Sequence, residues 1–492
     1  MNAVRRHWIT GGAIAVVLSV LVTACGGGGG GASPGPSPAG AGKTTFVSGV
    51  ITGFGSVIVN GVHYESDSAT VTLEGQPGTV GDLKVGEVVH LEAEADAQGN
   101  MHATTIDQDR LIQGVVQAVD ATGSTLTVEG QLILVDNETS FDDSIPGRSL
   151  AGILVGDRVE VNGFVSASGE ALATRIEMAD AGDNEIEVTG PVTALDKVAR
   201  RFTVGTQVVD YSIATLQGFA ASDPEEGDIV EAQGTALLAD GALQATEVQK
   251  EDGGMEGDQG DEGELEGLVT SVNLPTDFEV SGQKIMIAPS TTFVGGTSAD
   301  LLVDTRVEVE GHLDSGGALV ADKVIFRHES TVKLSAPVEA VGTDGTLQVL
   351  GVTIVVTPDT RMEDNETDDH FFSLGGVSVG NWVEVSAYPD PTDSTRLVAT
   401  RLERDDPEDL VELRGPAVDL NLTAPTGTFK IAGVSIATTS DTTFGDGNTQ
   451  VGAGDFYVLA VDQVVEVEGT WVGASLIASE AEIVHASGDH SE

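Results

Sequence analysis

The chain has 492 residues, and its 78 acidic residues against 23 basic ones give a formal net charge of −55 at pH 7. Nucleic-acid binding needs basic patches that displace counterions, so this composition excludes a nucleic-acid partner. Anionic lipid head groups would also be repelled, which excludes membrane binding through a basic patch. A single cysteine excludes disulfides, cysteine-ligated zinc and iron–sulfur clusters.

The first 24 residues have the three parts of an export signal. Arg5 and Arg6 form a positive region, residues 11–22 form a short apolar run, and small residues lead to Cys25. A secretory apolar region has about 7–15 residues, whereas a membrane-spanning helix needs about 20. We therefore expect residues 1–24 to be a signal peptide that is cleaved before Cys25, and not a permanent membrane anchor.

The segment Leu21-Val22-Thr23-Ala24-Cys25 resembles the lipobox of bacterial lipoproteins. The resemblance implies that Cys25 carries a thioether-linked diacylglyceryl group, which suits the nucleophilic thiolate. Two or more acyl chains hold a protein stably at a bilayer. In such lipoproteins an aspartate directly after the cysteine favours retention in the inner membrane, and this chain has Gly26 at that position. The resemblance therefore implies a lipoprotein of the outer membrane, in the cell envelope. Residues 25–43 are rich in Gly, Pro and Ser, which predicts a flexible tether after the lipid.

From about Thr44 onward the chain repeats one pattern six times. Its clearest element is a strand in which apolar and acidic residues alternate, as from Asp304 to Gly311. This alternation predicts one buried face and one face that presents carboxylates to water. Three strands and a loop with a Thr-x-Phe pattern precede it, and a fifth strand follows. These predicted loops include 139–141, 292–293 and 443–444.

Five strands in each repeat and no amphipathic helical run predict an all-β fold of tandem small five-stranded barrels, with no helix of note outside the signal peptide. Three strands, a loop and two strands fit an OB-like barrel, and an SH3-like barrel or a small sandwich is the alternative. The predicted β repeats are 44–110, 111–180, 184–252, 265–329, 330–406 and 407–487.

An acidic, Gly-rich segment at 253–264 separates the third and fourth repeats. It has little apolar surface to bury, so we expect a disordered linker. The other joints are only a few residues long. These features predict two groups of three modules on a hinge near residue 258.

The run Val47-Ser-Gly-Val-Ile-Thr-Gly-Phe-Gly-Ser-Val-Ile-Val-Asn-Gly-Val-His-Tyr64 closely resembles the opening of the bacterial domain-of-unknown-function family numbered 5666. Such domains occur in tandem behind a lipobox and a polyglycine tether. The resemblance covers nearly the whole mature chain and is closest in the first two repeats. It implies an all-β, envelope-exposed protein and assigns no activity.

Catalytic signatures are absent from the sequence, which has no Gly-x-Ser-x-Gly elbow, no His-Glu-x-x-His and no phosphate-binding loop. We therefore assign no catalytic residue and no cofactor. His63, His90 and His102 could converge on a metal site, although exposed strand histidines are the simpler interpretation. A hydrolase that uses paired carboxylates is the weakest alternative, because no pair stands out by motif.

Two acidic loops offer the oxygen ligands that calcium prefers. The candidate ligands in the fifth repeat are Glu363, Asp364, Glu366, Asp368 and Asp369. The corresponding loop of the second repeat holds Asp136, Asn137, Glu138, Asp142 and Asp143. Neither loop has the order of an EF-hand, so a solvated acidic loop is the simpler interpretation and no metal site is assigned.

The sequence favours a non-enzymatic, lipid-anchored envelope protein whose barrels act as a scaffold, a spacer or a protein-binding surface. Repetition multiplies surfaces, whereas a single active site needs no six copies. Its expected partners are the membrane, through the lipid, and an envelope protein or glycan. The alternative is an envelope module that binds calcium or glycan. Cys25 is the residue with a definite predicted chemical role.

Overall fold

The structure is a computed structural model that describes residues 43–484, apart from 122, 220–222, 252–254, 256, 368, 424–425 and 448. The predicted signal peptide and Cys25 lie outside the described residues. Nearly all of the regular secondary structure of the described chain is β-strand, as the alternating apolar pattern predicts. Within this part of the chain, no helix has the length and apolar character needed to cross a membrane.

Repeat 1 shows the strand order that all six repeats share. Strand β1 (Thr44–Gly53) pairs antiparallel with β2 (Val57–Val59), and β2 pairs antiparallel with β3 (Val62–Glu65). β3 then runs parallel to β7 (Met101–Gln108), which pairs with β6 (Val88–Ala95), and β6 returns to β1. The order first, second, third, fifth, fourth and first closes a five-stranded barrel, so the predicted all-β tandem barrels are confirmed.

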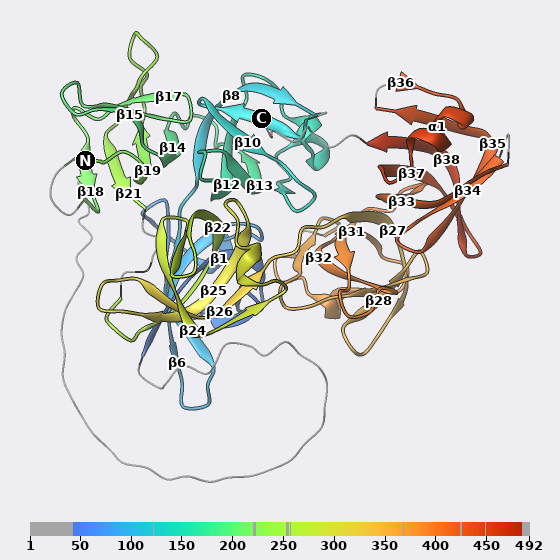
Figure 1. Cartoon of the computed structure of the whole chain (residues 1–492), viewed down its shortest axis with the longest axis horizontal. Coiled ribbons are helices and arrows are strands. Elements are labelled where there is room, and N and C mark those ends of the chain that lie inside the picture. Colours follow the sequence, from blue (N-terminus) through green and yellow to red (C-terminus); the bar gives the residue numbers. More distant parts are fainter. Residues whose placement is uncertain are drawn as a thin grey trace. The chain divides into compact units, whose positions relative to one another are not determined.

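The other elements follow the same scheme (Figure 1). Repeat 1 also contains β4 (Thr70–Leu73), β5 (Gln76–Gly78) and the 3-10 helix η1 (Val80–Asp82). Repeat 2 contains β8 (Ile112–Asp120), β9 (Thr125–Val128), β10 (Gln131–Leu134), β11 (Ser140–Phe141), η2 (Pro146–Arg148), η3 (Leu150–Gly152), β12 (Arg158–Val165) and β13 (Ala171–Met178). Repeat 3 contains β14 (Ile186–Pro191), β15 (Thr193–Asp196), β16 (Arg201–Val204), β17 (Gln207–Asp210), β18 (Thr215–Gln217), β19 (Ile229–Gly234), β20 (Leu243–Gln244) and β21 (Glu247–Lys250).

The second half of the chain repeats the scheme with longer strands. Repeat 4 contains β22 (Glu262–Asn273), β23 (Asp277–Val280), β24 (Gln283–Val294), η4 (Ser298–Asp300), β25 (Arg306–Leu313) and β26 (Leu319–Phe326). Repeat 5 contains β27 (Val332–Val341), β28 (Thr346–Val349), β29 (Val352–Val355), β30 (Arg361–Asp364), η5 (Leu374–Gly376), β31 (Trp382–Pro389) and β32 (Arg396–Asp405). Repeat 6 contains β33 (Val411–Thr423), β34 (Thr426–Ile431), β35 (Val434–Asp446), β36 (Thr449–Gln450), α1 (Ala453–Leu459), β37 (Val464–Val472) and β38 (Ser475–Val484).

The Thr-x-Phe segments form strands and not loops. They extend the third strand of the barrel and run parallel to the far half of the fifth strand, as β11 does beside β13. The Thr139 hydroxyl accepts a hydrogen bond from the Asp136 N–H at 3.1 Å and donates one to the Ala173 carbonyl at 2.9 Å. The same two bonds are made by Thr291, Thr360 and Thr442. The predicted loop is wrong because this threonine returns the chain to the barrel wall.

First strands of different barrels pair with one another and join the repeats in twos. β1 runs parallel to β22, with Thr45 opposite Glu262. β8 adjoins β14, and β27 pairs antiparallel with β33 so that Leu334 lies opposite Leu413. Repeats 1 and 4, repeats 2 and 3, and repeats 5 and 6 therefore share sheets (Figure 1).

The predicted linker and hinge are corrected by this pairing. β22 begins at Glu262, and the Glu264 side chain is only 3% exposed, so the end of segment 253–264 is sheet. Met255 packs into the core of repeat 4. The predicted hinge between two groups of three is wrong, because repeat 4 adds its first strand to repeat 1 of the other group.

Each of the first four barrels has a separate core cluster, made mainly of Val, Leu and Ile, and the cluster of repeat 4 also includes Phe46 of repeat 1. Repeats 5 and 6 share a single core cluster. Repeat 6 also has the one α-helix among the described residues, α1, which follows the third strand in the sequence and buries Phe456 and Tyr457. The expectation of no helix of note therefore holds except for this seven-residue helix.

Candidate functional site

The acidic faces of several strands are covered by neighbouring repeats. Glu308, on the alternating strand of repeat 4, is 2% exposed, and Glu187 at the junction of repeats 2 and 3 is 0% exposed. The predicted solvated carboxylate face is wrong for Glu308, which lies on one of the alternating strands. A buried carboxylate is costly unless a cation or a hydrogen-bond donor accompanies it. Arg327 pairs with Glu308, whereas Glu187 has Arg110 Nε at 3.8 Å.

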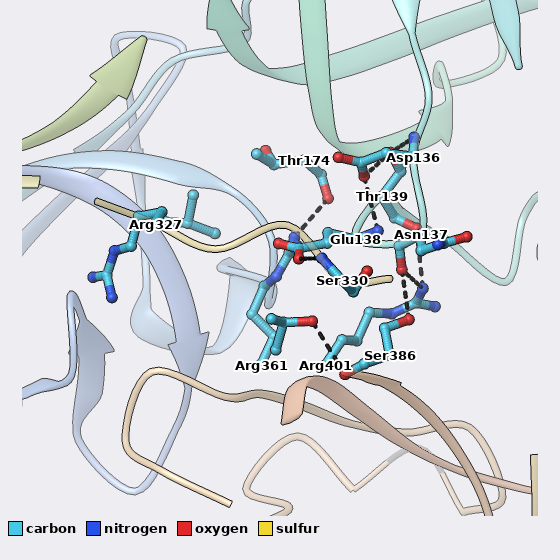
Figure 2. Close-up of polar contacts among 12 residues, drawn as sticks. Asp136, Asn137, Glu138, Thr139, Thr174, Arg327, Ser330, Arg361, Ser386 and Arg401 are labelled. Atoms are coloured by element: carbon cyan, nitrogen blue, oxygen red, sulfur yellow. Dashed lines mark hydrogen bonds and ion pairs between the residues drawn. The ribbon is translucent and has the colours of Figure 1, made fainter. Parts of the chain in front are cut away.

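The buried polar junction of repeats 2 and 5 is the most elaborate of these contacts, and Figure 2 shows its side chains. Glu138 lies at its centre and is 7% exposed. Its Oε2 is 3.3 Å from Arg306 Nη1 and 3.4 Å from Arg361 Nη2. Its Oε1 accepts a hydrogen bond from the Ser330 N–H at 3.0 Å. One carboxylate of repeat 2 thus contacts both repeat 4 and repeat 5.

Arginines of repeat 5 also bind the backbone of repeat 2 (Figure 2). The Arg401 guanidinium donates to the carbonyls of Asn137 at 3.4 Å and Thr139 at 3.2 Å. The Ser386 hydroxyl donates to the same Asn137 carbonyl at 2.7 Å. Arg361 Nη1 donates to the Thr174 carbonyl at 3.2 Å. These donors satisfy carbonyls that would otherwise be buried without partners.

Arg175 forms a second polar cluster, which joins repeats 1, 2 and 5. Its Nη1 donates to the Val85 carbonyl at 3.1 Å and pairs with Glu363 Oε1 at 3.0 Å. Its Nη2 pairs with Asp142, which also pairs with Lys84 at 3.2 Å. The turn before β6 of repeat 1 and strand β30 of repeat 5 therefore meet at one arginine of repeat 2.

The electrostatics of the clusters follow from burial and from the nearby cations. Burial raises the pKa of Glu87 to about 8. Burial also raises the pKa of Asp142, but the Ser144 N–H and the charges of Arg175 and Lys84 outweigh it and hold this pKa well below its usual range. Asp142 therefore stays ionised, whereas Glu87 takes up a proton near neutral pH.

The candidate calcium ligands of repeat 5 form ion pairs and turn caps. Glu363 pairs with Arg175. The Asp364 carboxylate is bound by Arg404, whose Nε lies 2.8 Å from Oδ1, and Glu366 pairs with the same arginine at 3.3 Å. Asp369 accepts from the Phe371 N–H at 3.1 Å, and Asp368 lies outside the described residues.

The other candidate ligands are dispersed too. In the acidic loop of repeat 2, Asp136 caps a turn and Asp143 pairs with Arg148. His63 lies 3.0 Å from Ser56 Oγ, His102 lies 3.4 Å from Asp96, and His90 is half-buried on β6. Within the described ranges, no three His, Cys, Asp or Glu side chains are grouped to hold a metal ion.

Sequence reasoning missed Arg175, Arg361 and Arg401, which carry the junction. A signal was present, because only repeats 2 and 5 have Ala-Thr-Arg followed by Glu177 or Glu403 on the fifth strand. The position of the arginine is taken in the other repeats by Thr105, Glu247, Lys323 and Glu480. The arginine thus marks the two repeats that contact each other through this strand.

Comparison with known proteins agrees with this repeat structure. The family model described as Domain of unknown function (DUF5666) matches residues 46–107, 113–177, 189–249, 266–325, 335–403 and 418–482, one segment in each barrel. None of the curated proteins matches the chain at the required level of similarity. A solved structure titled drosophila Unr CSD456 is 14% identical, over 46% of this chain and 99% of that one, but its TM-score of 0.12 is too low to support an argument. The chain belongs to the DUF5666 family and carries six of its domains in tandem.

Proposed function

We propose that the chain is a lipid-anchored, non-enzymatic protein of the cell envelope, in which the six barrels act as a scaffold or spacer and offer a protein-binding surface. The observation that carries this proposal is the use of charged side chains at the junctions between repeats. Glu138, Arg361 and Arg401 each bond to another repeat. Buried ion pairs add little net stability, but an arrangement that leaves one partner buried without the other costs about 3–5 kcal/mol. Holding modules at fixed spacing is what a scaffold requires.

The carboxylates with raised pKa values support a structural role and not catalysis. Catalytic acids and bases often have such shifts, but they must reach a substrate. Glu87 and Glu308 are 5% and 2% exposed and lie under neighbouring repeats. Their pKa values are raised first of all by burial. A substrate would have to separate two barrels to reach them.

The scaffold role predicts a fixed distance between repeats 2 and 5. Nitroxide labels at Leu154 and Val379, which are 65% and 66% exposed, can report this distance in the lipid-free chain with Cys25 replaced by Ser. We expect a narrow distance distribution that broadens when Arg361 and Arg401 are both replaced by Ala. A broad distribution in the unaltered junction would contradict the scaffold role.

The lipid anchor is tested separately through Cys25. Metabolic labelling with an alkyne fatty acid should mark the wild-type chain and leave Cys25→Ala unlabelled and released from membranes. Gly26→Ala is the matched control, because it keeps the thiol and should stay labelled. Membrane fractionation of Cys25→Ala that matches the wild type would overturn the lipoprotein assignment.

A further inference from the structure

Two adjoining cavities run along repeat 1 where it meets repeats 2 and 5. The first, of about 440 Å³, lies on repeat 1, and the second, of about 720 Å³, lies between repeat 1, Arg175 and the acidic loop of repeat 5. Phe54, Gly81 and Phe371 line both cavities, so the two form one continuous groove. We call it the Phe371 groove.

Aromatic rings stand at the middle of the Phe371 groove. Phe371 is 61% exposed, although it is one of the largest apolar side chains in the repeat. The His370 ring lies edge-on to Phe371, with centroids 5.0 Å apart, and stacks on Phe54 at 4.0 Å. An exposed ring supported from behind offers a firm apolar surface to a ligand.

Carboxylates outnumber cations along the same groove. Its lining holds eight carboxylates and two cations, Lys84 and Arg175. Both cations already pair with Asp142. Four of the lining carboxylates form no ion pair with any cation among residues that the structure describes: Glu65, Asp67, Asp82 and Asp369. A cleft lined by one sign of charge concentrates ligands of the opposite sign.

We propose that the Phe371 groove binds an extended protein segment that carries lysine or arginine side chains. An apolar side chain of the segment packs on Phe371, and its cations lie against the unpaired carboxylates and the aromatic faces. Carboxylates and aromatic rings are the groups that bind ammonium and guanidinium ions in proteins. An anionic partner would be repelled. This proposal rests on the protein-binding role proposed above and names the chemistry of its partner.

The test uses a fluorescein-labelled octapeptide of alternating lysine and leucine as the probe, at physiological salt, with binding to the lipid-free chain followed by fluorescence anisotropy. The groove variant is Glu65→Gln/Phe371→Ala. The matched control, Asp441→Asn/Val472→Ala, removes one exposed carboxylate and one exposed apolar side chain from repeat 6. All four side chains are exposed, so both variants should keep the melting temperature of the wild type.

We expect the groove variant to weaken probe binding about tenfold. The control variant should weaken it less than twofold, because it changes only the general attraction of an acidic chain for a basic peptide. A glutamate-leucine octapeptide should not bind. Equal weakening by both variants, or no binding to the wild type, would overturn the proposal. If spermine displaced the probe at the same concentration as the unlabelled peptide does, the groove would bind cations in general and not a protein segment. Neither the Cys25 labelling nor the distance between repeats 2 and 5 depends on this result.

Discussion

Arg175 of repeat 2 and Arg401 of repeat 5 occupy equivalent positions on the fifth strands of their barrels, and each guanidinium bonds to the other repeat. Arg175 pairs with Glu363, and Arg401 donates to the Thr139 carbonyl. Such reciprocity is typical of the interface of a two-fold dimer. Here it joins two repeats of one chain, which explains why the same strand carries arginine in both.

The first prediction concerns Arg401, which is 8% exposed and pairs with Glu403, itself 4% exposed. Arg401→Met should lower the free energy of unfolding by about 3 kcal/mol or more, because it leaves a buried carboxylate without its cation. Arg401→Lys should not restore the loss, since an ammonium group lacks the planar fork that reaches several acceptors at once. Urea unfolding followed by circular dichroism measures both.

Arg396 provides the control for this experiment, because it lies on the same strand with a side chain that is 37% exposed. Its partner Asp393 is 43% exposed, and its buried partner Asp390 keeps hydrogen bonds from the Thr392 N–H and hydroxyl, so Arg396→Met should change the free energy of unfolding by about 1 kcal/mol or less. If Arg401→Met cost no more than Arg396→Met, the buried junction would contribute nothing of its own.

A second prediction compares Gly86 and Gly156, which occupy the same turn in repeats 1 and 2. Both have positive φ, at 90° and 99°, so alanine is strained at either position by about 1 kcal/mol. A Cβ at Gly156 would meet open space, whereas one at Gly86 would lie 3.1 Å from the Thr174 carbonyl of repeat 2. Gly86→Ala should therefore destabilise the chain more than Gly156→Ala in urea unfolding. Equal losses would show that the turn of repeat 1 is not pressed against repeat 2.

The third prediction is a pH dependence that comes from Glu87. Burial raises its pKa in the folded chain from 4.5 to about 8. The folded chain thus holds a proton that the unfolded chain releases in this interval. The stability that Glu87 contributes is fully present below pH 4.5 and is lost as the pH rises towards 8.

Glu87→Gln tests this dependence, because glutamine cannot ionise. Its side-chain oxygen can still accept the hydrogen bond that the Lys84 N–H donates to Glu87 at 2.8 Å. The variant should be close to the wild type in urea unfolding at pH 4.5 and exceed it at pH 8 by on the order of 4 kcal/mol. A difference of the same size at both pH values would mean that Glu87 does not titrate in this range.

The barrels could be predicted from the sequence because their signal is local. Apolar alternation from Asp304 to Gly311 is enough to indicate a strand. The contacts between repeats could not be predicted in the same way. Glu138 and Ser330 are 192 residues apart, and no local pattern records that they meet. For this reason the acidic residues were expected to face water, whereas arginines from distant repeats cover them.

The last prediction concerns calcium and the acidic loop of repeat 5. Asp364 has a side chain that is 0% exposed, and both of its oxygens accept from Arg404. Calcium would have to displace this arginine. The wild type should therefore melt at the same temperature in millimolar calcium as in the presence of a chelator. Arg404→Gln frees the Asp364 and Glu366 carboxylates together, so this variant should melt at a lower temperature and regain stability when calcium is added. Calorimetry with and without calcium distinguishes the two chains. An upward shift in the wild type equal to that in Arg404→Gln would mean that the arginine does not occupy the cation's place.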